Sequence, residues 1–194
     1  MAKNRKELIR ETAISVMSEL GFHDSTTDRI AQEAGMAVGT IYNYFRNKEE
    51  ILEYIFQVEF AKRQQAYQAE LASSRSALEK LSVLLETHFR AVGQDIAVGR
   101  ILVREHPAPG GTEENQITLF LQGVPSLIQT LLDQAAEAGE IGPLDTELVA
   151  AAIFGAVQGV TFQAVFTESE SKRKEILAAA PQGLMELFLN GLNR

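Results

Sequence analysis

The chain has no cysteine and no tryptophan among its 194 residues. Without cysteine the protein can form neither a disulfide bond nor a thiolate metal site, and it has no thiol nucleophile. The three histidines, His23, His88 and His106, lack HExxH or any comparable metal-ligand spacing. No glycine-rich phosphate loop, no GxSxG segment and no convincing Ser/His/Asp set is visible. We therefore expect no metal, no cofactor and no enzymatic activity.

The residues after Met1 read AKNRKELIR, which is not a basic region followed by an apolar run. A secretory signal needs that order, so the sequence predicts none. The lack of cysteine is compatible with a reducing compartment. We expect a cytoplasmic protein.

Basic residues are scarce, since 18 Lys and Arg face 26 Asp and Glu for a net charge of -8. Such a balance is unfavourable for binding a polyanion, but the distribution of charge matters more than its sum. Residues 1–50 hold seven basic and eight acidic residues, so most of the acidity falls in residues 51–194. Near the start, Lys3, Arg5, Lys6 and Arg10 against Glu7 form a basic arm that we expect to contact phosphates.

Apolar residues recur at helical spacing along most of the chain, without strand-like alternation of useful length and without an internal repeat. Pro125 and Pro181 fall inside two helical segments, where proline should kink or divide a helix. The fold class is therefore all-α, with about nine helices. They are expected up to Gly21, then over 26–34, 38–45, 48–72, 78–92, 96–104, 113–138, 146–166 and 172–192.

Two short helices joined by a glycine turn follow one another between Thr26 and Leu52, which is the layout of a helix-turn-helix. Gly35 lies where a left-handed backbone ends the first helix at little steric cost. The second helix has an inward stripe of apolar residues, and its outward face carries hydrogen-bonding groups with little charge. Such groups suit base edges and phosphates. The inward stripe is Val38, Ile41 and Phe45, and the outward face is Gly39, Thr40, Tyr42 and Asn43, with Tyr44 at its edge.

This segment resembles the TetR-like transcriptional regulators, whose DNA-binding domain typically reads IA..AGV..GT.Y.YF..KE.L. The chain reads IAQEAGMAVGTIYNYFRNKEEIL there, and the resemblance covers residues 5–55. It implies a three-helix DNA-binding head over residues 1–50 and a helical effector-binding and dimerisation domain over 51–194. Ala37 and Val38 depart from the family, where many members have polar residues, so we expect no DNA contact from them.

The resemblance also implies roles for single residues of the head. Thr27, Thr40, Tyr44 and Lys48 would hold phosphates, and Gly39 would let the backbone approach the DNA. Tyr42 and Asn43 would meet bases or the neighbouring backbone, and Thr40 could do either.

Residues 148–166 are almost wholly apolar and contain Gly155 and Gly159 at GxxxG spacing. A membrane span, an ordinary core helix and a homodimer helix all fit such a run. Two glutamines and acidic flanks argue against membrane insertion. The resemblance implies that the last two helices pair with those of a second subunit as a four-helix bundle, with an interface that includes Ala152, Gly155, Gly159, Leu184, Leu187 and Phe188.

Helices between Leu78 and Phe166 offer many apolar side chains and few polar ones, which favours an apolar or amphipathic effector. Arg100 and Arg104 stand one helical turn apart, which fits either a carboxylate or phosphate site or a solvated face. The segments HFRAV, EAGEI and AAIFGAVQGV are similar to the fatty-acid-metabolism branch of the family, which responds to long-chain acyl-CoA. The expected effector-binding residues are His88, Arg100, Arg104, Phe120, Phe154, Gln158 and Phe162.

The resulting hypothesis is a homodimeric repressor that a hydrophobic effector releases from a palindromic operator in double-stranded DNA. Two alternatives remain: an efflux-type regulator that senses many drugs, and a helical lipid-carrier or interaction module that no longer binds DNA. The efflux-type regulator would differ in its effector. The carrier would lack the steep loss of DNA affinity with rising salt.

Overall fold

The computed structural model describes residues 4–105 and 116–190, and the side chains of these residues except 116–122. Within this part the protein is all-helical, which confirms the predicted fold class. The nine helices there are α1 Arg5–Leu20, α2 Thr27–Glu33, α3 Val38–Tyr42, α4 Lys48–Leu71, α5 Ala77–Gln94, α6 Ile96–Arg104, α7 Gln116–Glu137, α8 Thr146–Phe166 and α9 Glu170–Asn190.

Local sequence signals set the helix ends. The side chain of Thr26 accepts a hydrogen bond from the N–H of Arg29 at the start of α2, and Asn47 does the same for Glu50 at the start of α4. Gly21 (φ 83°) and Gly35 (φ 64°) have left-handed backbones after α1 and α2. These two glycines let the chain turn once after α1 and again after α2, so that the three helices of the head pack together.

Prolines do not divide the two helices that contain them. α7 continues through Pro125, and α9 continues through Pro181. A proline removes one backbone hydrogen bond, and tertiary packing can hold the flanking turns in place. Pro181 is buried, and α9 packs along α5 and α8. The expected division of these segments is therefore wrong, and the alternative expectation, a kink at the proline, stays a prediction.

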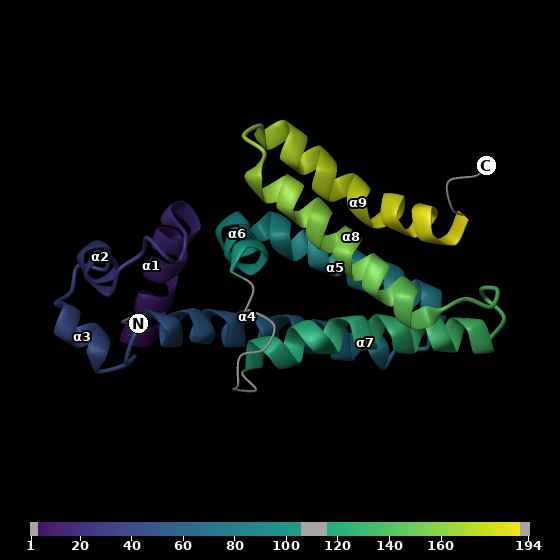
Figure 1. Cartoon of the computed structure of the whole chain (residues 1–194), viewed down its shortest axis with the longest axis horizontal. Coiled ribbons are helices and arrows are strands. Elements are labelled where there is room, and N and C mark those ends of the chain that lie inside the picture. The colour runs from purple at the N-terminus through teal and green to yellow at the C-terminus, as the bar shows by residue number, and fades with distance from the viewer. Residues whose placement is uncertain (1–3, 106–115, 191–194) are drawn as a thin grey trace.

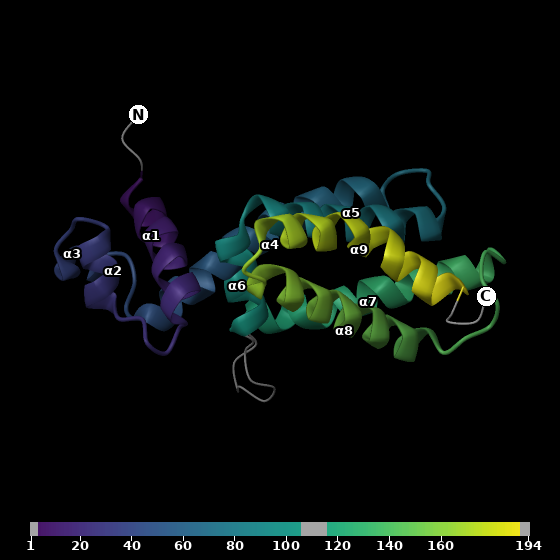
Figure 2. The ribbon, with the colours of Figure 1, turned by 90° about the horizontal axis from the view of Figure 1, so that it is seen from above.

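The molecule consists of a small head and a larger helical body (Figures 1 and 2). α1, α2 and α3 form the head, and α4 runs out of it along the body beside α7. α8 and α9 lie across the body as a pair, and α6 lies where head and body meet. α6 packs on α1 of the head and on α8 of the body. α4 and α6 thus physically link the two parts.

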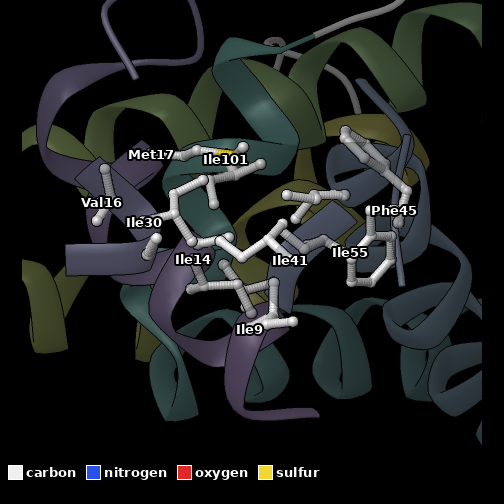
Figure 3. Packing of buried hydrophobic residues seen from close by; sticks show 14 of the residues in the cluster. Ile9, Ile14, Val16, Met17, Ile30, Ile41, Phe45, Ile55 and Ile101 are labelled. Atoms are coloured by element: carbon white, nitrogen blue, oxygen red, sulfur yellow. The ribbon is translucent and has the colours of Figure 1, made fainter. Parts of the chain in front are cut away.

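The core of the head draws on both linking helices. Its centre is a set of isoleucines that includes Ile9, Ile30 and Ile41, all fully buried (Figure 3). Ile55 of α4 and Ile101 of α6 complete this cluster from the other side. The predicted domain boundary after residue 50 thus falls inside a continuous core, and it stays a prediction.

Candidate DNA-binding head and effector cavity

Helix α3, the second helix of the predicted helix-turn-helix and here called the reading helix, has its polar side facing outward. Ile41 is fully buried, whereas Tyr42 is 55% exposed and Tyr44 is 37% exposed. Gly39 and Asn43 are exposed as well, and Thr27 and Thr40 are half-buried. α3 ends at Tyr42, and Asn43 is its C-cap. Five of the residues expected to meet DNA therefore lie on α3 and the turn after it, whereas Thr27 begins α2 and Lys48 begins α4, and their individual roles stay predictions.

Lys48 is half-buried, and its charged group contacts the protein itself. Its Nζ donates hydrogen bonds to the backbone oxygens of Phe22 (2.8 Å), His23 (3.0 Å) and Ser25 (3.1 Å). The same ammonium lies 4.4 Å from the centre of the Phe22 ring, a cation–π contact. These partners occupy all three N–H donors of a lysine. Here Lys48 holds the turn between α1 and α2, and a phosphate contact would require it to leave these carbonyls.

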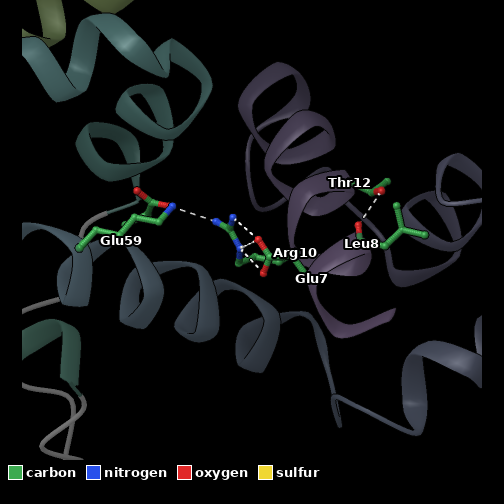
Figure 4. A network of polar contacts seen from close by, with 6 residues as sticks. Glu7, Leu8, Arg10, Thr12 and Glu59 are labelled. Carbon is green, nitrogen blue, oxygen red and sulfur yellow. Dashed lines mark hydrogen bonds and ion pairs between the residues drawn. The ribbon is translucent and has the colours of Figure 1, made fainter. Parts of the chain in front are cut away.

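Two residues of the basic arm, Lys6 and Arg10, make contacts within the protein. Arg10 is buried, and its guanidinium bonds Glu7 at 2.6 Å and Glu59 of α4 at 3.0 Å (Figure 4). Lys6 lies over the ring of Tyr54, 4.1 Å from its centre. Lys3 lies outside the described residues, and Arg5 is exposed. The expectation that Arg10 contacts phosphates is wrong, because Arg10 instead joins the head to α4.

The Glu7 carboxylate is the main reason that the pKa of Arg10 is raised above its usual value, and it outweighs the opposite effect of burial. Lys62 donates to the same oxygen of Glu59 that Arg10 contacts, at 2.8 Å. The buried guanidinium thus has carboxylate partners from two helices, and its charge is compensated.

Helix α6 carries different contacts on its different faces. Val98 and Ile101 belong to the core of the head. At its C-terminal end, the Glu105 carboxylate accepts a hydrogen bond from the N–H of Phe22 in the head at 3.0 Å. Toward α8, a Cβ on Gly99 would lie only 3.0 Å from Val165, so glycine permits a close approach there. A shift of α6 would therefore move the head relative to α8.

The two arginines expected to bind the effector, Arg100 and Arg104, contact the end of α8, and their role toward the effector stays a prediction. Nε of Arg100 donates to the backbone oxygen of Val165 at 2.9 Å. The guanidinium of Arg104 lies 4.8 Å from the centre of the Phe166 ring. Neither residue lines the cavity described below. From the sequence, Arg100 and Arg104 form a pair because they share a helix face. In the structure that face lies against α8.

A mostly apolar cavity of about 90 Å³ lies in the body between α4, α5, α7 and α8. Three residues expected to bind the effector, His88, Phe154 and Gln158, line it. Phe162 does not, because it is 52% exposed on the outer side of α8. The side chain of Phe120 is outside those that the structure describes. The remaining lining residues are Phe56, Phe60, Arg63, Tyr67, Leu81, Leu84, Leu85, Leu102, Val124, Leu127, Ile128 and Val157.

His88 is neutral in this cavity. Burial, aided by the nearby charge of Arg63, lowers its pKa from 6.5 to about 3. Its Nε2 lies 3.0 Å from the hydroxyl oxygen of Thr161, whose own proton is donated to the backbone oxygen of Val157 at 2.7 Å. Since that hydroxyl has only one proton, Nε2 carries hydrogen and donates to it. His88 thus ties α5 to α8 as a neutral imidazole.

Sequence reasoning missed Arg63, which is only 7% exposed in the cavity wall. A signal was present, because Arg63 continues the apolar positions Phe56 and Phe60 at helical spacing and precedes Tyr67 by one turn. A single charge within an inward stripe is a departure from amphipathic patterning. Such a position predicts a buried cation.

The outer side of α8 and α9 is apolar and has no partner within the described part of the chain. Of the residues expected at a dimer interface, Ala152, Gly155, Gly159 and Leu187 are exposed. Leu184 is buried against its own chain, and Phe188 is half-buried. Leu148, 66% exposed, and Phe162 add large apolar groups on α8. This face fits a second subunit, with Phe162 in place of Leu184.

α8 is also the one helix of the described residues that is long and apolar enough to span a membrane, with a mean hydropathy of 1.7. Length and hydropathy do not distinguish a membrane span from a core helix. α8 packs against α6, α7 and α9 of its own chain, and its Thr161 bonds His88. These contacts are those of a helix within a folded bundle.

Comparisons with known proteins match both parts of the molecule. The family model described as bacterial regulatory proteins, tetR family, matches residues 9–55, and the tetracyclin repressor-like C-terminal domain matches residues 74–162. The fatty acid metabolism regulator protein of Bacillus subtilis (strain 168) is 28% identical over 186 residues, which cover 95% of this chain and 94% of that protein.

Solved structures agree over nearly the whole length. The transcriptional regulator FadR from Bacillus subtilis in complex with stearoyl-CoA has a TM-score of 0.82 at 28% identity, and the match covers 96% of this chain and 99% of that one. The fatty acid degradation regulator FadR from Bacillus halodurans has a TM-score of 0.84 at 28% identity, with 100% and 99% covered. The arrangement of head, linking helices and body is thus shared with these regulators.

Proposed function

The chain belongs to the TetR family of bacterial transcriptional regulators, and we propose that long-chain acyl-CoA is the effector that releases it from its operator. It is a DNA-binding regulator, and its relatives are regulators rather than enzymes. In this proposal it works in the cytoplasm as a homodimeric repressor of genes for fatty-acid metabolism.

The observation that carries this proposal is that the cavity and the head share side chains. Phe56 and Phe60 of α4 belong to the core of the head and also line the cavity. Leu102 of α6 packs against the same core and lines the cavity too. Since packed cores do not deform continuously, a ligand that displaces these side chains moves the head as well.

The size of the cavity implies that a long ligand must displace them. A cavity of about 150 Å³ accommodates benzene, and this one has about 90 Å³. A groove of about 500 Å³ between α4 and α7 shares Phe60, Tyr67, Val124 and Leu127 with it. An acyl chain that enters from this groove would have to push α4 and α7 apart.

Displacement of α4 and α6 would disturb the spacing of the two heads. A dimer that binds two half-sites on one DNA face needs its reading helices ~34 to 36 Å apart. An effector that binds the wrongly spaced state better by about 1 to 3 kcal/mol would lower operator affinity some 5- to 150-fold.

The apolar lining suits an acyl chain. The relative that is solved with stearoyl-CoA supports the same choice for this chain. An efflux-type regulator would be released by unrelated hydrophobic drugs as well. A carrier module would bind lipid without salt-dependent DNA binding.

Fluorescence anisotropy of the protein on DNA from its own upstream region tests the proposal. Stearoyl-CoA titrated at fixed salt should release the DNA saturably, and free CoA should not. A complex that stays intact at saturating stearoyl-CoA would reject the acyl-CoA effector and leave the DNA-binding function standing.

A further inference from the structure

Arg63 is a buried cation with unused hydrogen-bond donors. It lies in the middle of α4 between Phe60 and Tyr67, and it is 7% exposed. Its Nε and Nη1 are fully buried and have no hydrogen-bond acceptor among the residues that the structure describes. Buried polar groups in folded proteins almost always have partners, and a buried charge without one is costly. Such a group calls for a ligand.

The nearby carboxylates of Glu59 and Asp95 act on Arg63 only at a distance, because neither accepts a hydrogen bond from its buried Nε or Nη1. Glu59, one turn earlier on α4, is engaged by Arg10 at 3.0 Å and by Lys62 at 2.8 Å. None of the described side chains that line the cavity is a carboxylate. Burial lowers the pKa of the Arg63 guanidinium, but arginine stays charged at any physiological pH. The cavity therefore contains one positive charge and no negative one within the described residues.

The other polar groups of the wall are neutral. Burial raises the pKa of the Tyr67 phenol, so Tyr67 keeps its proton. His88 is neutral and donates to Thr161. All other lining side chains except Gln158 are apolar. The wall thus suits a ligand that is apolar over most of its length and has an oxygen acceptor at one point.

We propose that Arg63 binds the acyl oxygen of the effector, as the carboxylate of a long-chain fatty acid or as the thioester carbonyl of its CoA ester. The planar fork of a guanidinium donates two parallel hydrogen bonds to a carboxylate and one or two to a carbonyl oxygen. The acyl chain then lies against Phe60, Leu84 and Phe154 in the same cavity. This assignment rests on the proposed function, because it specifies how the effector is recognised.

Arg63 should also lower the stability of the free protein. Burial outweighs the attraction of the nearby carboxylates, and two buried donors of Arg63 have no acceptor, so replacing it by an apolar side chain of similar length removes that cost. Arg63→Met should therefore bind the effector worse and melt higher. A residue that served only packing would show the opposite change in melting temperature.

The test is calorimetric titration of palmitate and of palmitoyl-CoA into the DNA-free protein, with its Tm measured in the absence of ligand. Arg63→Met should weaken binding at least about tenfold, the effect of losing a hydrogen bond to a charged group. Its Tm should rise by about 2 to 4 °C or more. Arg63→Lys keeps the charge but loses the fork, so its affinity should fall without a rise in Tm.

Lys62→Met is the matched control, because it removes the same charge from the next position of α4, where the side chain is 60% exposed. It should leave both affinities unchanged. A loss for palmitate alone identifies the carboxylate as the bound group, a loss for palmitoyl-CoA alone identifies the thioester, and a loss for both identifies the shared carbonyl oxygen.

Unchanged affinity of Arg63→Met for both ligands would overturn the assignment and leave the proposed function intact. If the wild-type protein binds neither ligand, the proposed function and this inference fail together. If Arg63→Met does not fold, unchanged affinity of Arg63→Lys for both ligands overturns the assignment in its place.

Discussion

Two arginines of this protein are buried to nearly the same extent but differ in their hydrogen-bond partners. Arg10 in the head is 6% exposed and bonds Glu7 and Glu59, whereas Arg63 in the body is 7% exposed and lacks a carboxylate partner among the described residues. A buried ion pair fixes one arrangement of the two helices that carry it. A buried charge with unpartnered donors favours a ligand that accepts hydrogen bonds from them. The buried arginine of the head therefore stabilises one geometry, and the buried arginine of the body is available to bind a ligand.

Breaking the compensated pair should have the largest effect on stability. Arg10→Met leaves the Glu59 carboxylate, which is 11% exposed, with Lys62 alone. We expect a loss of about 3 kcal/mol in the free energy of unfolding, because the variant loses the ion pairs that the buried Arg10 makes with both Glu7 and Glu59 and leaves Glu59 with one of its two cations. Urea denaturation measures it, with Lys172→Met as control, because the Lys172 side chain on α9 is 54% exposed. A loss below about 1 kcal/mol would mean that the pair is not needed to join head and α4.

Lys48→Met should cost about 1 to 3 kcal/mol, since three backbone carbonyls lose a charged donor. The dependence of log affinity for DNA on log salt should stay nearly unchanged. Arg46, 88% exposed beside the reading helix, provides the contrast. Arg46→Met should leave stability intact and reduce the salt slope by about one unit. If Lys48→Met itself reduces the slope by one unit, the phosphate role expected from the sequence is correct.

Tyr42→Ala should weaken operator binding by about 1 to 3 kcal/mol and change stability by less than about 0.5 kcal/mol, because the ring is 55% exposed. Parallel titrations on operator and random DNA measure both affinities. A selective loss on the operator means that Tyr42 reads bases. Equal losses on both DNAs would assign it to the backbone instead.

His88 should make stability depend on pH in a limited window. Because its pKa is about 3 when folded and 6.5 otherwise, the unfolded chain binds more protons in between. Stability is fully present above pH 6.5 and falls below it, by about 2 kcal/mol between pH 7 and 5. His88→Gln should remove this part of the loss. An equal loss in the variant would show that His88 is not held neutral.

Features that depend on local pattern were predictable from the sequence. The exposed side of α3 follows from helical spacing, since Ile41 is buried and Tyr42 is exposed. The caps Thr26 and Asn47 and the turn glycines Gly21 and Gly35 act within a few residues. These signals do not depend on the rest of the fold.

Features that depend on packing between distant segments were not predictable in the same way. From the sequence Arg10 is part of a basic arm, but in the structure it bonds Glu59 of α4, which is distant in the sequence. Arg100 and Arg104 share a helix face, but that face meets Val165 and Phe166 of α8. Phe162 is apolar like the cavity residues, yet α8 turns it outward. In each case the sequence is compatible with two roles for the side chain, and a tertiary contact determines which one the structure shows.

The central claim is that filling the cavity in the body changes the spacing of the heads through Phe56, Phe60 and Leu102. Because the chain has no cysteine, Gln32→Cys on the exposed side of α2 gives one spin-labelling site per subunit. Double electron–electron resonance on the DNA-free dimer then measures the distance between the heads. Stearoyl-CoA should shift or broaden the distance distribution, and free CoA should not. An unchanged distribution at a stearoyl-CoA concentration that releases DNA would contradict the account.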